Sequence, residues 1–144
     1  MPSTLTQARD EILDRVRVLV ASIDAAVRPE VAWPDVQPSF SRAPGTSWVE
    51  PVIRHATSEQ STLAAQPGSR VWTQTGTLLV FVYTPSGNGM KKSDIISQVI
   101  QNGFRGFATA SGVWFKKPTV VETGASGAWQ QSIFSVEFEY YQRM

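Results

Sequence analysis

The chain has 144 residues, close to the common size of one domain, and it contains no cysteine. The lack of cysteine excludes a thiolate nucleophile, an iron–sulfur cluster and a zinc site with cysteine ligands. Thirteen basic and 12 acidic residues leave a net charge of +1, which argues against a protein that must neutralise many phosphates. The longest apolar run, Leu78–Tyr83, is far shorter than the ~20 residues of a membrane span. The N-terminus lacks the pattern of a signal peptide, so we expect a soluble protein that is not secreted.

The first predicted element is an amphipathic helix over residues 4–26. Ser3, Thr4 or Thr6 is expected to cap its start, and Pro29 to stop it. Apolar residues recur along it at spacings of three and four, which predicts one buried stripe, made of Leu5, Ala8, Ile12, Val16, Leu19, Val20 and Ile23.

An irregular segment is predicted next, over residues 29–47, because prolines are frequent there. Residues 47–55 then read as an extended segment, in which Pro51 indicates an edge strand or a broken one. Residues 56–69 are polar and are the best candidate for a mobile loop. We interpret residues 1–144 as one domain in which 29–69 forms a Pro-rich irregular segment followed by this loop.

The first strong strand is predicted over residues 70–83, which are rich in Val, Thr, Trp, Leu and Phe. Its last six residues are apolar on both faces, which is typical of a central strand covered from both sides. Gly76 is a candidate position for a bulge.

The second half of the chain predicts a helix over residues 91–109, with Ser93 as its cap, and then a β-hairpin. The first strand of the hairpin covers residues 113–123 and is interrupted by Pro118, and residues 124–127 form the turn. Residues 129–141 alternate, with Phe134, Val136, Phe138 and Tyr140 on one face and Ser135, Glu137, Glu139 and Tyr141 on the other. This order predicts an α+β fold, in which a mostly antiparallel sheet of four to five strands has two helices packed on one face and ends in a C-terminal β-hairpin.

Motifs for catalysis or cofactor binding are not found. His55 is the only histidine, which excludes a two-histidine metal site, and a surface or hydrogen-bonding role is expected for it. The segment 87–93 lies between a strand and a helix but does not match a phosphate-binding loop. The pairs Lys91–Lys92 and Lys116–Lys117 leave open a small basic patch with Arg105, and hence nucleic-acid binding, beside the simpler reading of solvated surface charge. We therefore expect no enzyme activity, metal or cofactor.

Two blocks of the sequence resemble a known family. VWTQTGTLLVFVYTP, within residues 70–85, and GAWQQSIFSVEFEYYQRM, within residues 127–144, are similar in pattern to the tail terminators of siphophages, of the lambda type. The resemblance implies a hexameric ring that caps the tail tube at the neck-proximal end of the virion, stops tube polymerisation and joins tail to head. It implies assembly in the host cytoplasm, and contacts with the tube protein and with connector or neck proteins. DNA would pass through the lumen without specific binding, and no membrane is involved.

Two other functions remain open beside this one: a head–tail connector or neck adaptor, and a small nucleic-acid-binding module. For the assembly functions, the candidate contact residues near the expected edge strand and loop are Trp48, Arg54, Glu59 and Arg70. Lys91 and Lys92, which start the second helix, are candidates for a contact between subunits, and Glu137 and Glu139 for a lumen-facing or outward face. Each of these residues also has a simpler reading as ordinary surface.

Overall fold

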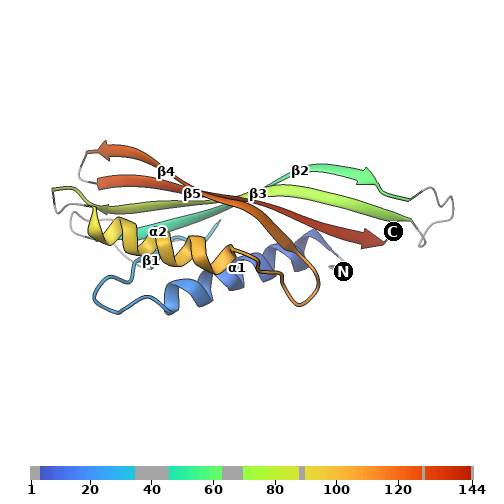
Figure 1. Cartoon of the computed structure of the whole chain (residues 1–144), viewed down its shortest axis with the longest axis horizontal. Coiled ribbons are helices and arrows are strands. Elements are labelled where there is room, and N and C mark those ends of the chain that lie inside the picture. Colours follow the sequence, from blue (N-terminus) through green and yellow to red (C-terminus); the bar gives the residue numbers. More distant parts are fainter. Residues whose placement is uncertain (1–3, 35–45, 63–69, 88–89, 128, 144) are drawn as a thin grey trace.

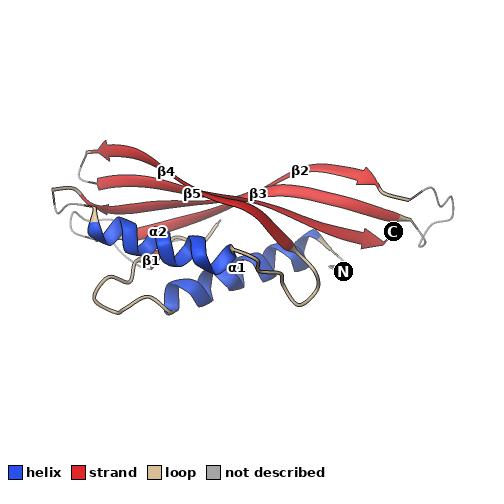
Figure 2. Ribbon diagram, in the orientation of Figure 1, coloured by secondary structure: helices blue, strands red, loops and turns tan. Residues whose placement is uncertain are grey.

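The computed structural model describes residues 4–34, 46–62, 70–87, 90–127 and 129–143. Its five-stranded sheet has the strand order β1-β2-β3-β5-β4, and two helices lie on one face of it (Figures 1 and 2). The predicted α+β class is confirmed, although β1 pairs with β2 in parallel and the sheet is therefore mixed. No helix among the described residues is long and apolar enough to cross a membrane. The elements are α1 (Leu5–Ala21), β1 (Glu30–Val31), β2 (Trp48–Gln60), β3 (Val71–Pro85), α2 (Lys91–Phe104), β4 (Trp114–Ser126) and β5 (Trp129–Arg143).

Helix α1 starts as predicted but ends earlier. The Thr4 side chain caps it by accepting a hydrogen bond of 3.0 Å from the Gln7 amide. The prediction that the helix runs to residue 26 is wrong, because polar side chains compete with the helical hydrogen bonds from Ser22 onward. Ser22 Oγ donates to the Leu19 carbonyl at 2.6 Å, and the Arg28 guanidinium donates to the Ala21 carbonyl at 3.1 Å.

Strand β2 is an edge strand over most of its described length, as Pro51 predicted. The Ser47 and Val49 carbonyls accept hydrogen bonds of 3.0 and 2.8 Å from the amides of Glu30 and Ala32. Every second residue of a strand points its backbone groups to the same neighbour, so the backbone nitrogen of Pro51 also faces the β1 side. Because proline has no N–H to donate, the pairing with β1 stops there. The prediction of irregular chain over 29–47 is thus wrong at β1, and residues 35–45 lie outside the described residues.

The predicted loop at 56–69 is wrong over its first part, because residues 56–60 continue β2. The register shifts between His55 and Thr57, and the strand then pairs with β3 again. The hydroxyl groups of Thr57 and Thr75 form a hydrogen bond across the two strands. Polar β-branched residues of this kind are compatible with an exposed strand as well as with a loop. Residues 63–69 lie outside the described residues.

Strand β3 occupies the centre of the sheet, between β2 and β5, as predicted. Leu78, Val80 and Val82 are completely buried, whereas the residues that alternate with them are only partly buried. Among the described residues, the predicted cover is found on one side only, because both helices lie on the same side of the sheet (Figure 2). Gly76 does lie beside a bulge, since it pairs with His55 where β2 shifts its register.

Helix α2 begins at Lys91, but Ser93 is not its cap. The N-cap residue is Met90, which makes no side-chain capping bond, and Ser93 is buried with its Oγ 3.0 Å from Ser132 Oγ. The helix ends at Phe104 rather than 109, because Arg105 is extended and Gly106 has a φ of +65°, which favours glycine.

The C-terminal hairpin is present with a tighter turn than predicted. Pro118 interrupts β4, whose register shifts between Lys116 and Thr119. Gly124 belongs to β4, which runs to Ser126, so the predicted turn at 124–127 is wrong in its bounds. Along β5 the predicted alternation is confirmed, because the four residues Phe134, Val136, Phe138 and Tyr140 are buried.

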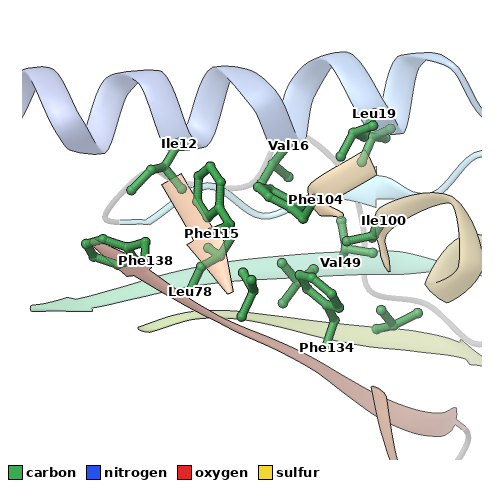
Figure 3. Packing of buried hydrophobic residues seen from close by; sticks show 14 of the residues in the cluster. Ile12, Val16, Leu19, Val49, Leu78, Ile100, Phe104, Phe115, Phe134 and Phe138 are labelled. Atoms are coloured by element: carbon green, nitrogen blue, oxygen red, sulfur yellow. The ribbon is translucent and has the colours of Figure 1, made fainter. Parts of the chain in front are cut away.

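The core lies between the helices and the inner face of the sheet, the face that α1 and α2 cover (Figure 3). Phe104 of α2 is central to it, with ring centroids 4.8 Å from Phe115 and 5.5 Å from Phe134. Side chains from both helices and from the strands complete it, among them Ile12, Val16, Leu19, Val49, Leu78, Ile100 and Phe138.

Candidate protein interaction surfaces

The sheet has a second face, here called the outer sheet face, that no described helix or strand covers (Figure 2). Near the β4–β5 hairpin it is mostly apolar, although Glu50 lies beside Phe81 on β2. Cross-strand partners place Phe81, Ile133 and Val121 in one row over three strands, and Leu79 beside Val52 in the next row. The Val121 side chain is 50% exposed. An uncovered row of apolar side chains is typical of a protein-binding surface.

Aromatic residues close one end of this apolar half. The ring of Trp48 stacks on that of Tyr83 at a centroid distance of 3.9 Å and meets Trp129 edge-on at 6.4 Å. Trp129 Nε1 donates a hydrogen bond of 3.2 Å to the Thr46 carbonyl. Trp48, a predicted contact residue, is only 6% exposed. It therefore positions the partly exposed Tyr83 ring and exposes little surface to a partner itself.

The other half of the outer sheet face, here called the polar half, carries Glu137 and Glu139. The rings of Trp114 and Tyr141 also lie there and meet edge-on at 5.0 Å. Lys116 Nζ lies 2.6 Å from Glu139 Oε2, and Lys117 Nζ lies 4.0 Å from Glu137 Oε2. The hydrogen bond to Glu139, together with the carboxylate charge, raises the pKa of Lys116. The two glutamates therefore share one face, as predicted, and lysines of the neighbouring strand balance their charge.

The lysine pairs do not form one basic patch with Arg105. Lys91 and Arg105 are separated by the length of α2, about 20 Å at 1.5 Å per residue. Gln101, near the C-terminal end of α2, donates a hydrogen bond of 3.0 Å to the Pro118 carbonyl, which places Lys117 near that end as well. The shared patch that the sequence left open is therefore not formed by Lys91 and Lys92, which leaves the simpler reading of surface charge for them.

The remaining predicted contact residues lie on the β2–β3 pair. Arg54 and Glu59 are exposed in β2, opposite Thr77 and Thr73, and Arg70 directly precedes β3. The two strands extend past the helices, and the end of β5 extends beside β3 (Figure 1). We call this part, residues 57–62 and 70–75, the β2–β3 arm. Of these three residues, Glu59 was predicted to lie in a loop and lies on β2 instead, while Arg54 lies in the strand where an extended segment was predicted.

His55 faces the core side of the sheet. Its Nε2 lies 2.9 Å from the Tyr140 hydroxyl, and its ring meets the Phe138 ring edge-on at 5.3 Å. Burial and then the charge of Arg9 lower the pKa of His55, and burial raises the pKa of Tyr140. The predicted hydrogen-bonding role is confirmed.

A second surface feature is a groove of about 720 Å³ between α1 and residues 107–110, here called the α1 groove. Apolar and acidic side chains line it together. Val18, 41% exposed, and Phe107 supply apolar surface, while the carboxylates of Asp10, Glu11 and Asp14 supply negative charge.

Contacts between α1 and the segment after α2 fix the shape of the groove. The Glu11 carboxylate accepts two hydrogen bonds from Ser111, one of 2.6 Å from the Ser111 hydroxyl and one of 3.3 Å from the Ser111 amide. Burial alone would raise the pKa of Glu11, but these hydrogen bonds outweigh it and lower the pKa. The Arg15 guanidinium lies 3.8 Å from the centre of the Phe107 ring and donates to the Gly103 carbonyl at 2.8 Å.

Sequence reasoning missed this groove. The available signal was Val18, an apolar residue off the buried stripe of α1. Leu5 was assigned to that stripe but is 48% exposed, because it begins the helix beyond the part that packs on the sheet. Of these two exposed side chains, only Val18 lines the groove.

Comparison with known proteins identifies a family. A family model described as phage tail terminator protein matches residues 11–132, well over half of the chain. No curated protein matches the sequence. Solved structures do match, and one of them superposes with a TM-score of 0.71 at 14% identity, with 96% of each chain covered. At that identity the likeness shows the fold alone.

Proposed function

The chain belongs to the phage tail terminator family, and we propose that its copies close into a ring that caps the tail tube. Family membership makes it a structural protein of the phage tail and not a member of an enzyme family. In the proposal the ring has six copies and sits at the neck-proximal end of the tail. It stops polymerisation of the tube and provides the surface for head–tail joining.

The observation that carries the proposal is the uncovered outer sheet face. Sheets bury an apolar face against another layer, and α1 and α2 cover only the inner face. The apolar half, with Phe81, Ile133 and the exposed Val121, therefore suits a permanent protein partner better than water. We assign this half to the contact with the tail tube protein.

The polar half of the same face suits a channel for DNA. Glu137 and Glu139 give it negative charge, and Lys116 and Lys117 leave it close to neutral. A balanced surface of this kind does not hold phosphates tightly, so DNA would pass without specific binding. The exposed Arg54 and Glu59, with Arg70 at the far end of the β2–β3 arm, are assigned to contacts with neighbouring tail or connector proteins.

The test is a polymerisation assay with the tube protein of the same phage. Tubes are grown with and without the purified chain, and their lengths are measured by electron microscopy. We expect shorter tubes with the chain bound at one end. Binding to head-side connector rings, with unchanged tube length, would favour a neck adaptor instead. Binding to neither would overturn an assembly role at this junction.

A further inference from the structure

The two ends of the helical layer carry opposite charge. The α1 groove is negative and the start of α2 is positive, so the two surfaces of neighbouring copies are complementary. We propose that the start of α2 in one copy, Met90–Lys92, docks in the α1 groove of the neighbouring copy. This inference rests on the proposed function, because it names the contact that closes the ring. A head-to-tail contact between two different surfaces is the type that generates rings.

The α1 groove is suited to a cation beside an apolar group. Three carboxylates and one guanidinium, that of Arg15, line the groove. The Arg15 guanidinium already contacts the Phe107 ring and donates hydrogen bonds to the Gly103 carbonyl. Asp14 pairs with Arg17 at 2.6 Å on the exposed side of the helix. Asp10 is exposed and has no ion pair within the described part of the chain. The groove therefore keeps free negative charge next to Val18 and Phe107.

The start of α2 carries the matching groups. Lys91 is exposed and Lys92 is partly exposed, and neither has a carboxylate partner among the described residues. The N-terminus of the helix adds partial positive charge, so this end remains positive although Asp94 lies in the first turn. Met90, the N-cap residue, is partly exposed, and its flexible thioether suits an irregular apolar floor.

One molecule does not satisfy both surfaces by itself. The groove borders Phe107, just past the C-terminal end of α2. Lys91 lies at the opposite end of that helix, about 20 Å away by its rise per residue, and Figure 1 shows the start of α2 and the loop after it at opposite ends of the helical layer. A lysine side chain does not bridge that distance, so the partner of Met90–Lys92 is the groove of a second copy.

The experiment uses two charge-reversed forms of the full chain. In the groove variant, Asp10→Lys and Asp14→Lys place cations opposite the neighbour's lysines. In the helix variant, Lys91→Glu and Lys92→Glu place carboxylates opposite the neighbour's groove. Each variant alone repels itself at this contact, whereas a mixture of the two restores opposite charges at every contact of an alternating ring. Mass by light scattering is measured over a range of concentrations.

We expect the wild type to form a ring, each variant alone to be at least tenfold weaker in assembly, and the equimolar mixture to recover the ring mass. The matched control for the groove variant is Glu30→Lys with Glu122→Lys, which makes the same change in net charge on exposed strand positions and should assemble like the wild type. Circular dichroism confirms that each variant is folded.

Three results would overturn the inference. They are variants that assemble as well as the wild type, a mixture that fails to recover, and a wild type that stays monomeric at every concentration. The tube-capping assay is separate from all three. If the wild type caps tubes and the charge variants also assemble, the docking contact is wrong and the proposed function is unaffected. A wild type that neither caps tubes nor binds their ends removes the proposed function itself.

Discussion

The two faces of β3 are equally apolar in sequence, yet they meet different surroundings. Leu78, Val80 and Val82 point into the core and are fully buried. Leu79 and Phe81 point the other way and remain partly exposed, because no described element covers them. A strand that is apolar on both faces thus indicates two covering layers, and in an assembly protein the second layer can belong to another molecule. The inner face should control folding, and the outer sheet face should control assembly.

The largest effect on folding is expected from the inner face. Phe134→Ala removes a fully buried ring that packs 5.5 Å from Phe104, and the cavity left behind should cost about 3–5 kcal/mol of unfolding free energy. Urea denaturation measures this value. A loss below about 1 kcal/mol would mean that the inner face is not the main source of stability.

A smaller loss is expected where the backbone approaches the core closely. In Gly76→Ala the new Cβ would lie 2.5 Å from the Arg54 carbonyl oxygen and 2.5 Å from Phe138 Cζ, so the sheet or the ring must shift, at a cost of about 1–3 kcal/mol. Gly103→Ala is the comparison, because the three atoms nearest to its Cβ, at 2.2–2.9 Å, all belong to the Leu19 side chain. A side chain can change rotamer where a backbone carbonyl cannot, and the helix gains propensity of up to about 1 kcal/mol. If denaturation shows Gly103→Ala to be the more damaging change, the contact assigned to Gly76 is wrong.

A smaller, pH-dependent effect is expected from His55, also on the inner face. Its folded pKa lies below the ordinary value of 6.5, so the unfolded chain binds more protons between the two values. The contribution of His55 to the free energy of unfolding should therefore be fully present above about pH 6.5. It should be lost as the pH falls from there through the folded pKa of His55. Unfolding free energies of the wild type and His55→Gln, compared between pH 8 and pH 5, should converge as the pH falls. Parallel curves would contradict the assignment.

The smallest effect on folding, with a clear effect on assembly, is expected from the outer sheet face. Val121→Ser changes a half-exposed side chain, so unfolding should change by no more than about 0.5 kcal/mol, while binding to tube ends weakens. Val18→Ser is the matched change in the α1 groove, and it should weaken ring formation instead. Equal effects of the two variants on ring mass and on tube binding would show that the two surfaces are not separate.

Much of the fold could be predicted from the sequence, because the spacing of apolar residues indicates which face of each helix or strand is buried. The alternation of β5, the apolar stripe of α1 and the interruption at Pro118 all appear in the structure. The errors arose where local and long-range effects compete. Threonine and serine at 57–62 suit a loop or an exposed strand equally, and the long partner strand β3 decides between them.

The candidate site was less predictable for a related reason. Exposed apolar residues such as Val18 and Val121 acquire meaning only when the fold shows which face is uncovered. The α1 groove depends on contacts between α1 and residues about 100 positions later, such as that of Glu11 with Ser111. No local spacing in the sequence reports such a pair.

The most direct test of the central claim is to locate the chain on the tail tube. Labelled protein is added to preassembled tubes of the same phage, and its position is determined by electron microscopy. We expect label at one end of each tube and nowhere along its length, with the Val121→Ser variant bound more weakly at that same end. Label distributed along the tubes, or absent from them, would contradict a role in capping the tail tube.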